Sequence, residues 1–421
     1  MDKVGFMKGL KEWHESRFPT TVGLRKVGQE KEYPVVWAND YQAADVRILF
    51  PILIEKGWEP KYDEVYNNLI LGVMEPITGV EVTTEAGWCT LEIIMPPEES
   101  IIDSTLKLQK VEKMIVSLAR DQGMLVLGYG IQPISLPEPR LWIKKRRHEK
   151  IREVLPEGVN IVTITASDQV HVDITRDEVV DAVNVFNALS GLIIHLFANS
   201  PIWQGGVDPL YRLAVREDLW SFASPDRIGM PLIPYNNLED YLKATGLLKQ
   251  FLTRENGDYS TTEALYLDYM LKSPKTDWKY HWMLLEGMTW LNARVRTPYS
   301  TIEVRPACTA SLDGTEALTA LCLGIVENLT EVKEMVFEYP WSFWQGKRGR
   351  AIAGVQDDIM DSLADRMLML AEKGLKNRCY GEESLLGLLY DRLYLKTNPA
   401  KKALKVFEQE GFDSFIKTIS L

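Results

Sequence analysis

The sequence predicts an α+β fold in which helices flank a mostly antiparallel sheet. Short apolar segments at residues 68–73, 79–84 and 90–95 are separated by turn residues, which is typical of strands that return on one another. Strands and helices alternate elsewhere, but without a βαβ rhythm or a glycine-rich phosphate loop. With 46% apolar and 25% charged residues, the 421-residue chain can build a large core. No repeat, linker or low-complexity stretch divides it, so we expect one domain.

In the N-terminal third, apolar spacing and stop signals predict each element. Residues 6–17 and 43–56 have helical apolar spacing, and Gly57 ends the second helix. Residues 22–36 alternate and stop at Pro34, which predicts a turn or a strand around residues 27–32. After the three short strands, which Pro96 and Pro97 end, residues 100–122 predict a long helix closed by Gly123. Residues 124–131 predict a further strand.

The rest of the chain predicts two more sheet segments within helices and loops. Residues 160–174 and 294–306 are the predicted strands, and residues 176–199 and 238–252 are predicted helices. A loop-rich region covers residues 203–234, and Asn256-Gly257 predicts a small hairpin. The aromatic-rich stretch 278–290 is interpreted as helix core rather than as a pocket wall. Helices follow to the C-terminus.

Charge and cysteine content exclude several classes of protein. The net charge of −11 leaves no basic stripe, which argues against a nucleic-acid partner. The cationic cluster at residues 144–147 is interpreted as a solvated helix start, with a phosphate-holding role as the alternative. Four scattered cysteines give neither a disulfide framework nor a zinc site. Residues 189–198 are too few to cross a membrane, and no leader is recognisable, so we expect a cytoplasmic, reducing location.

Acidic residues on otherwise apolar strands are the most informative feature. Glu30 and Glu32 alternate and therefore share one strand face. Glu92 and Glu303 are each flanked by apolar residues, where a buried charge is costly unless a cation meets it. Glu85 begins the strand that carries Glu92. Converging carboxylates suit Mg²⁺, although pairing with arginines or exposure to solvent is the competing interpretation for each glutamate.

Two further side chains belong with these carboxylates if their strands are neighbours. His171 alternates with valines on a predicted strand, and a lone histidine in that setting is more often structural than a ligand. Arg305 lies two residues after Glu303 and shares its strand face, where its planar fork would meet a transferred phosphoryl group.

Six short segments occur in an order that is informative as a set. They are GQEKE at 28–32, TEAGWCTLE at 84–92, GYGIQP at 128–133, QVHVD at 169–173, FANSP at 197–201 and DRIG at 226–229. In this order they resemble the motifs of the glutamate–cysteine ligase superfamily of carboxylate–amine ligases, closest to its plant and proteobacterial branch. The resemblance covers roughly residues 20 to 400.

This resemblance implies a fold, a chemistry and a set of site residues. The fold would be glutamine-synthetase-like, with a curved antiparallel sheet forming a funnel, and residues 1–421 would form one catalytic ligase domain. ATP and Mg²⁺ would be the cofactors, and the γ-carboxylate of glutamate would become an acyl phosphate that an amine captures. The implied metal ligands are Glu30, Glu32, Glu85, Glu92, His171 and Glu303. The implied catalytic residue is Arg305, and the implied nucleotide- or substrate-binding arginines are Arg147, Arg227, Arg294 and Arg296.

Departures from the family pattern leave the amine open. The turn at residues 86–89 is less glycine-rich and one residue longer than in the plant branch, and residues 304–308 differ from that branch. Cysteine, which would give γ-glutamylcysteine for glutathione biosynthesis, is the first expectation. A ligase for another amine is the second, and a non-catalytic relative that binds nucleotide or an amino acid is the third.

Overall fold

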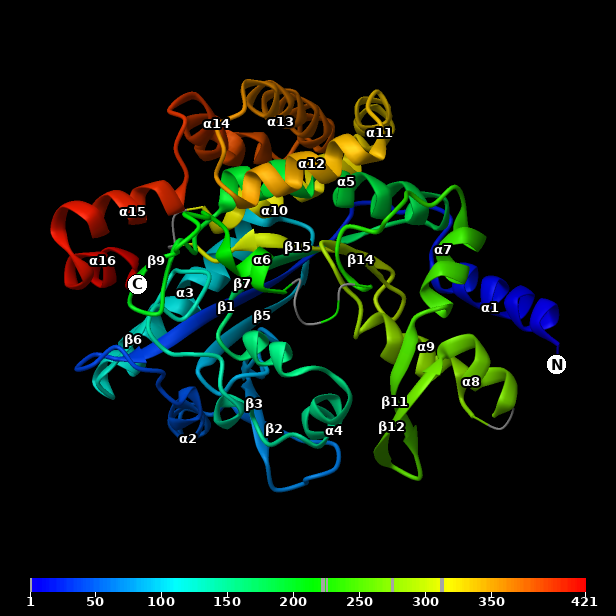
Figure 1. The fold of residues 1–421 in the computed structure, drawn as a ribbon, viewed down its shortest axis with the longest axis horizontal. Helices are drawn as coiled ribbons and strands as arrows, with labels where there is room; N and C mark the ends of the chain where they lie inside the picture. The colour runs from blue at the N-terminus through cyan, green and yellow to red at the C-terminus, as the bar shows by residue number, and fades with distance from the viewer. Residues whose placement is uncertain (1, 221–223, 225, 274–275, 311–313) are drawn as a thin grey trace.

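A nine-stranded antiparallel sheet forms the centre of the computed structural model, which describes residues 2–220, 224, 226–273, 276–310 and 314–421 (Figure 1). The strand order is β14-β15-β7-β1-β5-β4-β3-β2, and β6 pairs with the end of β1. The strands are β1 (Val27–Trp37), β2 (Glu59–Tyr62), β3 (Ile70–Met74), β4 (Glu81–Thr84), β5 (Thr90–Glu98), β6 (Met124–Val126), β7 (Ser167–Asp173), β14 (Ala293–Arg296) and β15 (Thr301–Cys308). The predicted α+β class and antiparallel sheet are confirmed.

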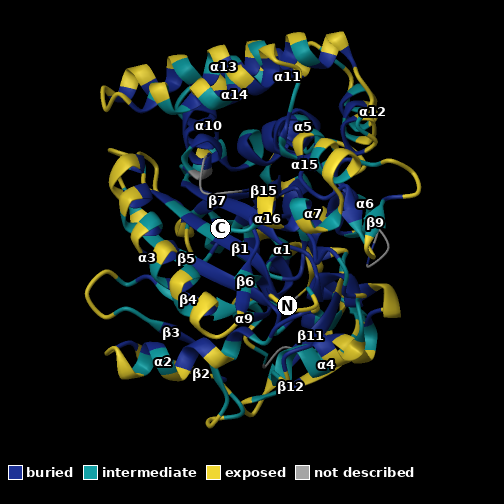
Figure 2. Cartoon of the chain, turned by 90° about the vertical axis from the view of Figure 1, so that its left-hand side faces the viewer, coloured by how far each residue is buried: buried dark blue, intermediate teal, exposed yellow. Residues whose placement is uncertain are grey.

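Helices cover one face of this sheet in layers (Figure 1). The first layer contains α3 (Ile101–Asp121), α5 (Val179–Phe197) and α10 (Thr315–Glu327), which contact β5, β15 and β7 respectively. Outside it lie α11 (Leu329–Phe337), α12 (Trp341–Ile352), α13 (Asp358–Arg378) and α14 (Gly387–Tyr394). Figure 2 shows exposed residues gathered on the outer helices and buried ones on the sheet and α5. Residues 176–197 are long and apolar enough to cross a membrane, yet 83% of their most apolar window is buried, as in a core helix.

The opposite side of the sheet is covered by smaller elements. These are α4 (Arg146–Val154), α6 (Val215–Trp220), α9 (Trp278–Glu286) and the hairpin of β11 (Lys249–Glu255) and β12 (Asp258–Leu265). Arg146 joins α4 to the hairpin through two hydrogen bonds of 2.8 and 2.9 Å to Asp258. Arg254 of the hairpin pairs with Glu64 in the loop after β2. The space between these elements and the sheet is therefore bounded on several sides.

The remaining elements lie at the margins of the sheet. They are α1 (Lys3–Arg17), α2 (Leu49–Glu55), α7 (Leu238–Gly246), α8 (Tyr266–Lys272), α15 (Pro399–Glu410) and α16 (Phe412–Ile419), with β8 (Ile202–Trp203) paired to β9 (Gly206–Val207) and β10 (Ile228–Gly229) paired in parallel to β13 (Trp290–Leu291).

Alternation along β1 gives the sheet two chemically different faces. Lys31 points toward the helices and pairs with Asp168 at 3.1 Å, and Tyr33 on the same face donates to Glu112 of α3. Glu30 and Glu32 consequently point to the other face. These two pairs lie on the helix side, so the second face carries a separate set of charges.

The structure corrects several predicted boundaries at prolines. The strand containing Pro34 continues to Trp37. Pairing of β1 with β7 ends at Lys31, pairing with β5 ends at Pro34, and pairing with β6 begins at Val35, so the proline lies where β1 changes neighbours. Pro96 and Pro97 do not end β5 either. They occupy the irregularity where the register with β1 shifts between Val27 and Gln29.

Other predicted elements are shorter or of a different kind. The predicted strand 160–174 begins only at Ser167, after a 3-10 helix over Glu157–Thr163, and the strand 124–131 ends at Val126. The helix 238–252 ends at Gly246, and the sequence continues as β11. The helix 43–56 is reduced to α2 after a 3-10 turn at Val46–Ile48, while β2 was not predicted. The long helix 100–122 is confirmed, with Ser100 capping its start.

Candidate active site

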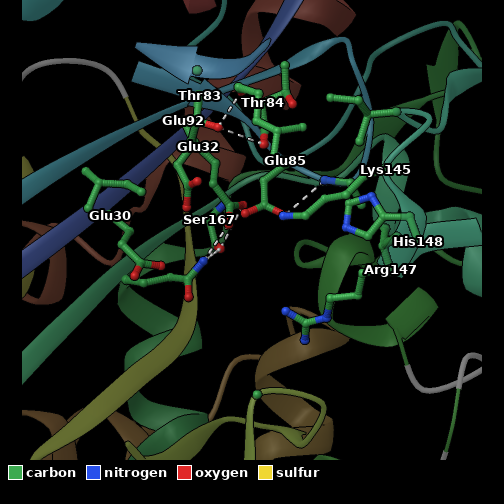
Figure 3. Close-up of a pocket in the computed structure, with 18 of the residues that line it drawn as sticks. Glu30, Glu32, Thr83, Thr84, Glu85, Glu92, Lys145, Arg147, His148 and Ser167 are labelled. Carbon is green, nitrogen blue, oxygen red and sulfur yellow. Dashed lines mark hydrogen bonds between the residues drawn. The ribbon is translucent and has the colours of Figure 1, made fainter. Parts of the chain in front are cut away.

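The free face of the sheet opens into a cavity of about 650 Å³ (Figure 3). This volume lies in the range of ligand pockets. Carboxylates and arginines of β1, β5, β14 and β15 line it on the sheet side, and α4 with the segment before it lines the opposite side. An apolar wall completes it, formed by Trp142, Ile143, Ile151, Val159, Val162, Trp220 and Trp290.

Glu32, Glu85 and Glu92 form the first carboxylate cluster. Glu32 and Glu92 are direct cross-strand partners on β1 and β5, and Glu85 follows β4. One carboxylate oxygen from each lies within 4.8 Å of the others. Glu32 also accepts from the backbone N–H and the hydroxyl of Ser167, at 2.7 and 3.0 Å. The sheet register therefore brings Glu32 beside Glu85 and Glu92, which are more than 50 residues away in the sequence.

The energetics of this cluster favour a bound cation. Burial, and then the charge of Glu85, raises the pKa of Glu32 to about 8. Burial and the charges of Glu85, Glu30 and Glu32 raise the pKa of Glu92 well above its usual value. Three neighbouring carboxyl groups cannot all ionise in a buried site unless positive charge compensates them. An all-oxygen donor set of this kind fits Mg²⁺.

Glu30, His171 and Glu303 form the second cluster, beside the first on the same face. Their candidate ligand atoms also lie within 4.8 Å of one another. His171 Nε2 is 3.1 Å from Glu30 and 3.9 Å from Glu303, and Nδ1 is 3.2 Å from the hydroxyl of Thr301. Burial alone would raise the pKa of Glu30, but the hydrogen bond and charge of His171 outweigh it and lower that pKa.

Three arginines converge on Glu303. Arg294 makes two hydrogen bonds of 2.8 Å to its carboxylate, Arg296 makes one of 2.6 Å, and Arg305 also donates to it. Burial would raise the pKa of Glu303, but the three guanidinium groups outweigh it and hold that pKa well below its usual value. Through these hydrogen bonds Glu303, a member of the second cluster, holds the three arginine side chains beside that cluster. Its role as a metal ligand stays a prediction.

Of the other two predicted arginines, Arg147 lies at the cavity and Arg227 does not. Arg147 lines the cavity from α4, and its Nε is buried without a hydrogen-bond partner. Arg227 does not line the cavity, and we correct its predicted role as a substrate contact. It is fully buried behind the wall, where it stacks at 4.0 Å on Phe251 and donates to the carbonyl oxygen of Lys249 at 2.9 Å. It supports the hairpin instead.

The cationic cluster at residues 144–147 is a helix start that is only partly solvated, and its phosphate-holding role stays a prediction. Its residues do start a helix, since α4 begins at Arg146, but Lys145 and Arg147 line the cavity. Burial lowers the pKa of both side chains. The aromatic stretch 278–290 divides in the same way, because Trp282 is core and Trp290 lines the cavity.

Sequence reasoning missed several residues that line the cavity. Arg216 is buried at the start of α6 and donates to Glu217 and to the carbonyl oxygen of Arg305. His148 lies on α4 directly after Arg147. Ser167 and Gln169 are on β7, beside the predicted His171. Period-two spacing from His171 would have found the last two, whereas no local pattern marks Arg216 or His148.

Comparison with known proteins places the chain in a family. A model of glutamate–cysteine ligase family 2 (GCS2) matches residues 59–391, and the chain belongs to this family. Among curated relatives, the chloroplastic glutamate–cysteine ligase of Arabidopsis thaliana is 23% identical over 347 residues, covering 76% of this chain and 64% of the relative. The corresponding enzyme of Solanum lycopersicum is 24% identical over 344 residues, covering 75% and 64%. The chain thus spans a little under two thirds of these relatives.

Two solved structures share the fold. A glutamate–cysteine ligase from Francisella tularensis in complex with AMP superposes with a TM-score of 0.61 at 12% identity, covering 96% of this chain and 88% of that one. A bifunctional glutathione synthetase from Pasteurella multocida gives a TM-score of 0.53 at 12% identity, covering 97% and 52%.

The raised pKa values of Glu32 and Glu92 predict pH-dependent Mg²⁺ binding. A carboxyl group whose pKa is raised on folding stabilises the cation-free protein at low pH, and this contribution is lost as the pH rises through about 8. Mg²⁺ must displace the bound protons, so we expect it to raise Tm more at about pH 8.5 than at about pH 6.5, measured by scanning calorimetry.

Two variants control this measurement. Glu92→Gln removes a clustered carboxylate and should abolish most of the pH-dependent difference. Glu408→Gln changes an exposed helix residue and should preserve it. Equal Mg²⁺ effects at both pH values in the unaltered protein would contradict the assignment.

Proposed function

We propose that the protein is an ATP- and Mg²⁺-dependent ligase that joins the γ-carboxylate of glutamate to an amine. The observation that carries this proposal is the pair of carboxylate clusters side by side in one cavity, with Arg305 and two more arginines at the second cluster. Membership of the glutamate–cysteine ligase family supports it. A binding protein would need neither both clusters nor the arginines, which argues against the non-catalytic alternative.

The donor sets fit the cations that such a reaction requires. Glu32, Glu85 and Glu92 would hold one Mg²⁺, and Glu30, His171 and Glu303 another. When bound, Mg²⁺ neutralises the phosphates of ATP so that an anionic nucleophile can approach. Arg294 and Arg296 provide further positive charge for the nucleotide.

Residues of the chain then have separate roles in phosphoryl and acyl transfer. The glutamate γ-carboxylate oxygen attacks the γ-phosphorus of ATP, the bond to the leaving oxygen breaks, and ADP departs. Arg305, held by Glu303 and Gln169, donates to the transferred phosphoryl oxygens as their charge develops. Arg147, which lines the cavity from α4, binds an anionic group of substrate from the opposite wall. The amine nitrogen then attacks the acyl carbon, and phosphate leaves.

The amine most consistent with the family is cysteine, which would give γ-glutamylcysteine. The segments that depart from the plant pattern lie at the cavity: Ala86 lines it, and Arg305 lies in the second segment. A γ-glutamyl ligase for a different amine is therefore the second candidate. We further propose that residues 1–421 act as one catalytic domain in a reducing compartment, the cytoplasm, where all four cysteines stay unpaired as they are in the structure.

The test of this proposal is ADP release from ATP and Mg²⁺ with glutamate plus a panel of amines. We expect release to depend on glutamate and on an amine, with cysteine the best acceptor. Preference for another amine would select the second candidate. Folded protein that releases no ADP with any amine would contradict ligase activity.

Arg305→Lys tests the arginine's role in transfer. Lysine keeps the charge but cannot reproduce the planar fork. We expect kcat to fall by about 10²–10³-fold, as for loss of one transition-state donor, while KM for ATP changes less than about threefold. Arg366→Lys, on the outer surface beside Glu338, is the matched control and should behave like the unaltered protein. Undiminished kcat for Arg305→Lys would remove this residue from the reaction.

A further inference from the structure

Arg305 lies at an irregularity of β15, where the pairing of this strand with β7 changes register. Val304 is the register partner of Val170 and Ala307 is that of Asp168, so the shift falls across Arg305. Irregularities of this kind re-aim a side chain, and they leave backbone groups that something other than the neighbouring strand must satisfy. The direction of the Arg305 side chain therefore depends on what holds its peptide groups.

Two residues outside β7 hold these peptide groups. The backbone N–H of Arg305 donates to the carbonyl oxygen of Asn292 at 2.9 Å, and the carbonyl oxygen of Arg305 accepts from Nη2 of Arg216 at 3.3 Å. Asn292 lies between β13 and β14, and Arg216 lies on α6. The backbone of Arg305 is thus fixed by two elements from separate parts of the chain.

The carboxylate of Glu217 connects the two residues that hold Arg305. One of its oxygens accepts from Arg216 at 2.5 Å, and the other accepts from the side-chain amide of Asn292 at 2.7 Å. Arg348 adds a hydrogen bond of 3.1 Å to Glu217 and one of 2.6 Å to Oδ1 of Asn292. Glu217 is buried, and it is not among the described residues that line the cavity. It therefore acts on substrates only through its neighbours.

The position of Glu217 distinguishes it from carboxylates that serve stability alone. Glu382 is also buried beside an arginine, since it pairs with Arg378 at 3.0 Å and accepts from the backbone N–H of Ile101 at 2.8 Å. Those partners belong to helices that cover the far face of the sheet. The partners of Glu217 instead include both residues that hold the peptide groups of Arg305.

We propose that Glu217 is a positioning residue that aims Arg305 at the transferred phosphoryl group. This inference rests on the proposed ligase function, in which Arg305 is the transition-state donor. A displacement of about 1 Å in such a group can cost on the order of 10²-fold in rate. Substrate affinity depends less on Glu217, because the carboxylate clusters and the arginines on β14 have their own contacts.

The test is a double-mutant cycle between Glu217→Gln and Arg305→Lys. Glutamine has nearly the same shape as glutamate, but its amide offers one acceptor oxygen where three donors converge. In the otherwise unaltered protein we expect Glu217→Gln to lower kcat for ADP release by about 10–10²-fold, with KM for ATP changed less than about threefold. In the Arg305→Lys background it should lower kcat less than about threefold, because the fork that Glu217 aims is already absent. An equal loss in both backgrounds would show a purely structural role and overturn the inference.

Two further variants complete the cycle. Glu382→Gln is the matched control, because it alters another buried, arginine-paired carboxylate and should leave kcat unchanged even where it lowers Tm. Arg348→Lys approaches the same network through a less buried residue. A lysine cannot bind Glu217 and Asn292 at once through a planar fork, so we expect kcat to fall by about 3–10-fold, and only while Arg305 is present.

A crystal structure of Glu217→Gln separates this inference from the proposed function. We expect the guanidinium of Arg305 to leave Gln169 and Glu303 in this variant and to keep its place in Glu382→Gln. An Arg305 that does not move in Glu217→Gln would overturn the inference, whatever the activity. Failure of the unaltered protein to release ADP would contradict the proposed function, and the position of Arg305 in the variant would still decide whether Glu217 holds it.

Discussion

Repulsion among buried carboxylates is the constraint around which this structure is organised. Glu32, Glu85 and Glu92 lie within 4.8 Å of one another in a buried site, where like charges are far more costly than in water. Without a cation the cluster keeps protons that ordinary glutamates lose, as the raised pKa values of Glu32 and Glu92 indicate. A divalent cation would relieve this repulsion, and its binding here is the part of our proposal that suits the site to phosphate chemistry.

In the second cluster, neighbouring arginines and a histidine compensate the negative charge of the carboxylates. Arg294, Arg296 and Arg305 surround Glu303 and hold its pKa well below its usual value, and His171 lies 3.1 Å from Glu30. The two clusters share one sheet because β1 contributes a glutamate to each, at residues 30 and 32. Behind them, Lys31 and Asp168 tie β1 to β7 on the helix side. Register in this part of the sheet thus fixes both the spacing of the clusters and the direction in which the arginines point.

Sequence predicted the parts of the site that follow from strand periodicity. The shared face of Glu30 and Glu32 and the meander that carries Glu85 and Glu92 follow from local spacing, and the resemblance ordered these segments into one site. The motifs did not locate every side chain correctly. Arg227 belongs to one of them, yet it does not line the cavity and is held by Phe251 and backbone carbonyls. Asn199, in another motif, joins the carbonyls of Gly128 and Thr309 and is structural. Arg216 and His148 depend on tertiary packing, which spacing does not reveal.

Direct observation of the cations would test the central claim best. Crystals grown with Mn²⁺, glutamate and a non-hydrolysable ATP analogue would show the ions by anomalous scattering. We expect one peak among the carboxylates of Glu32, Glu85 and Glu92 and a second beside Glu30 and His171, with Arg305 on the terminal phosphoryl group. A nucleotide bound in the cavity with no ion at the first cluster would contradict the account.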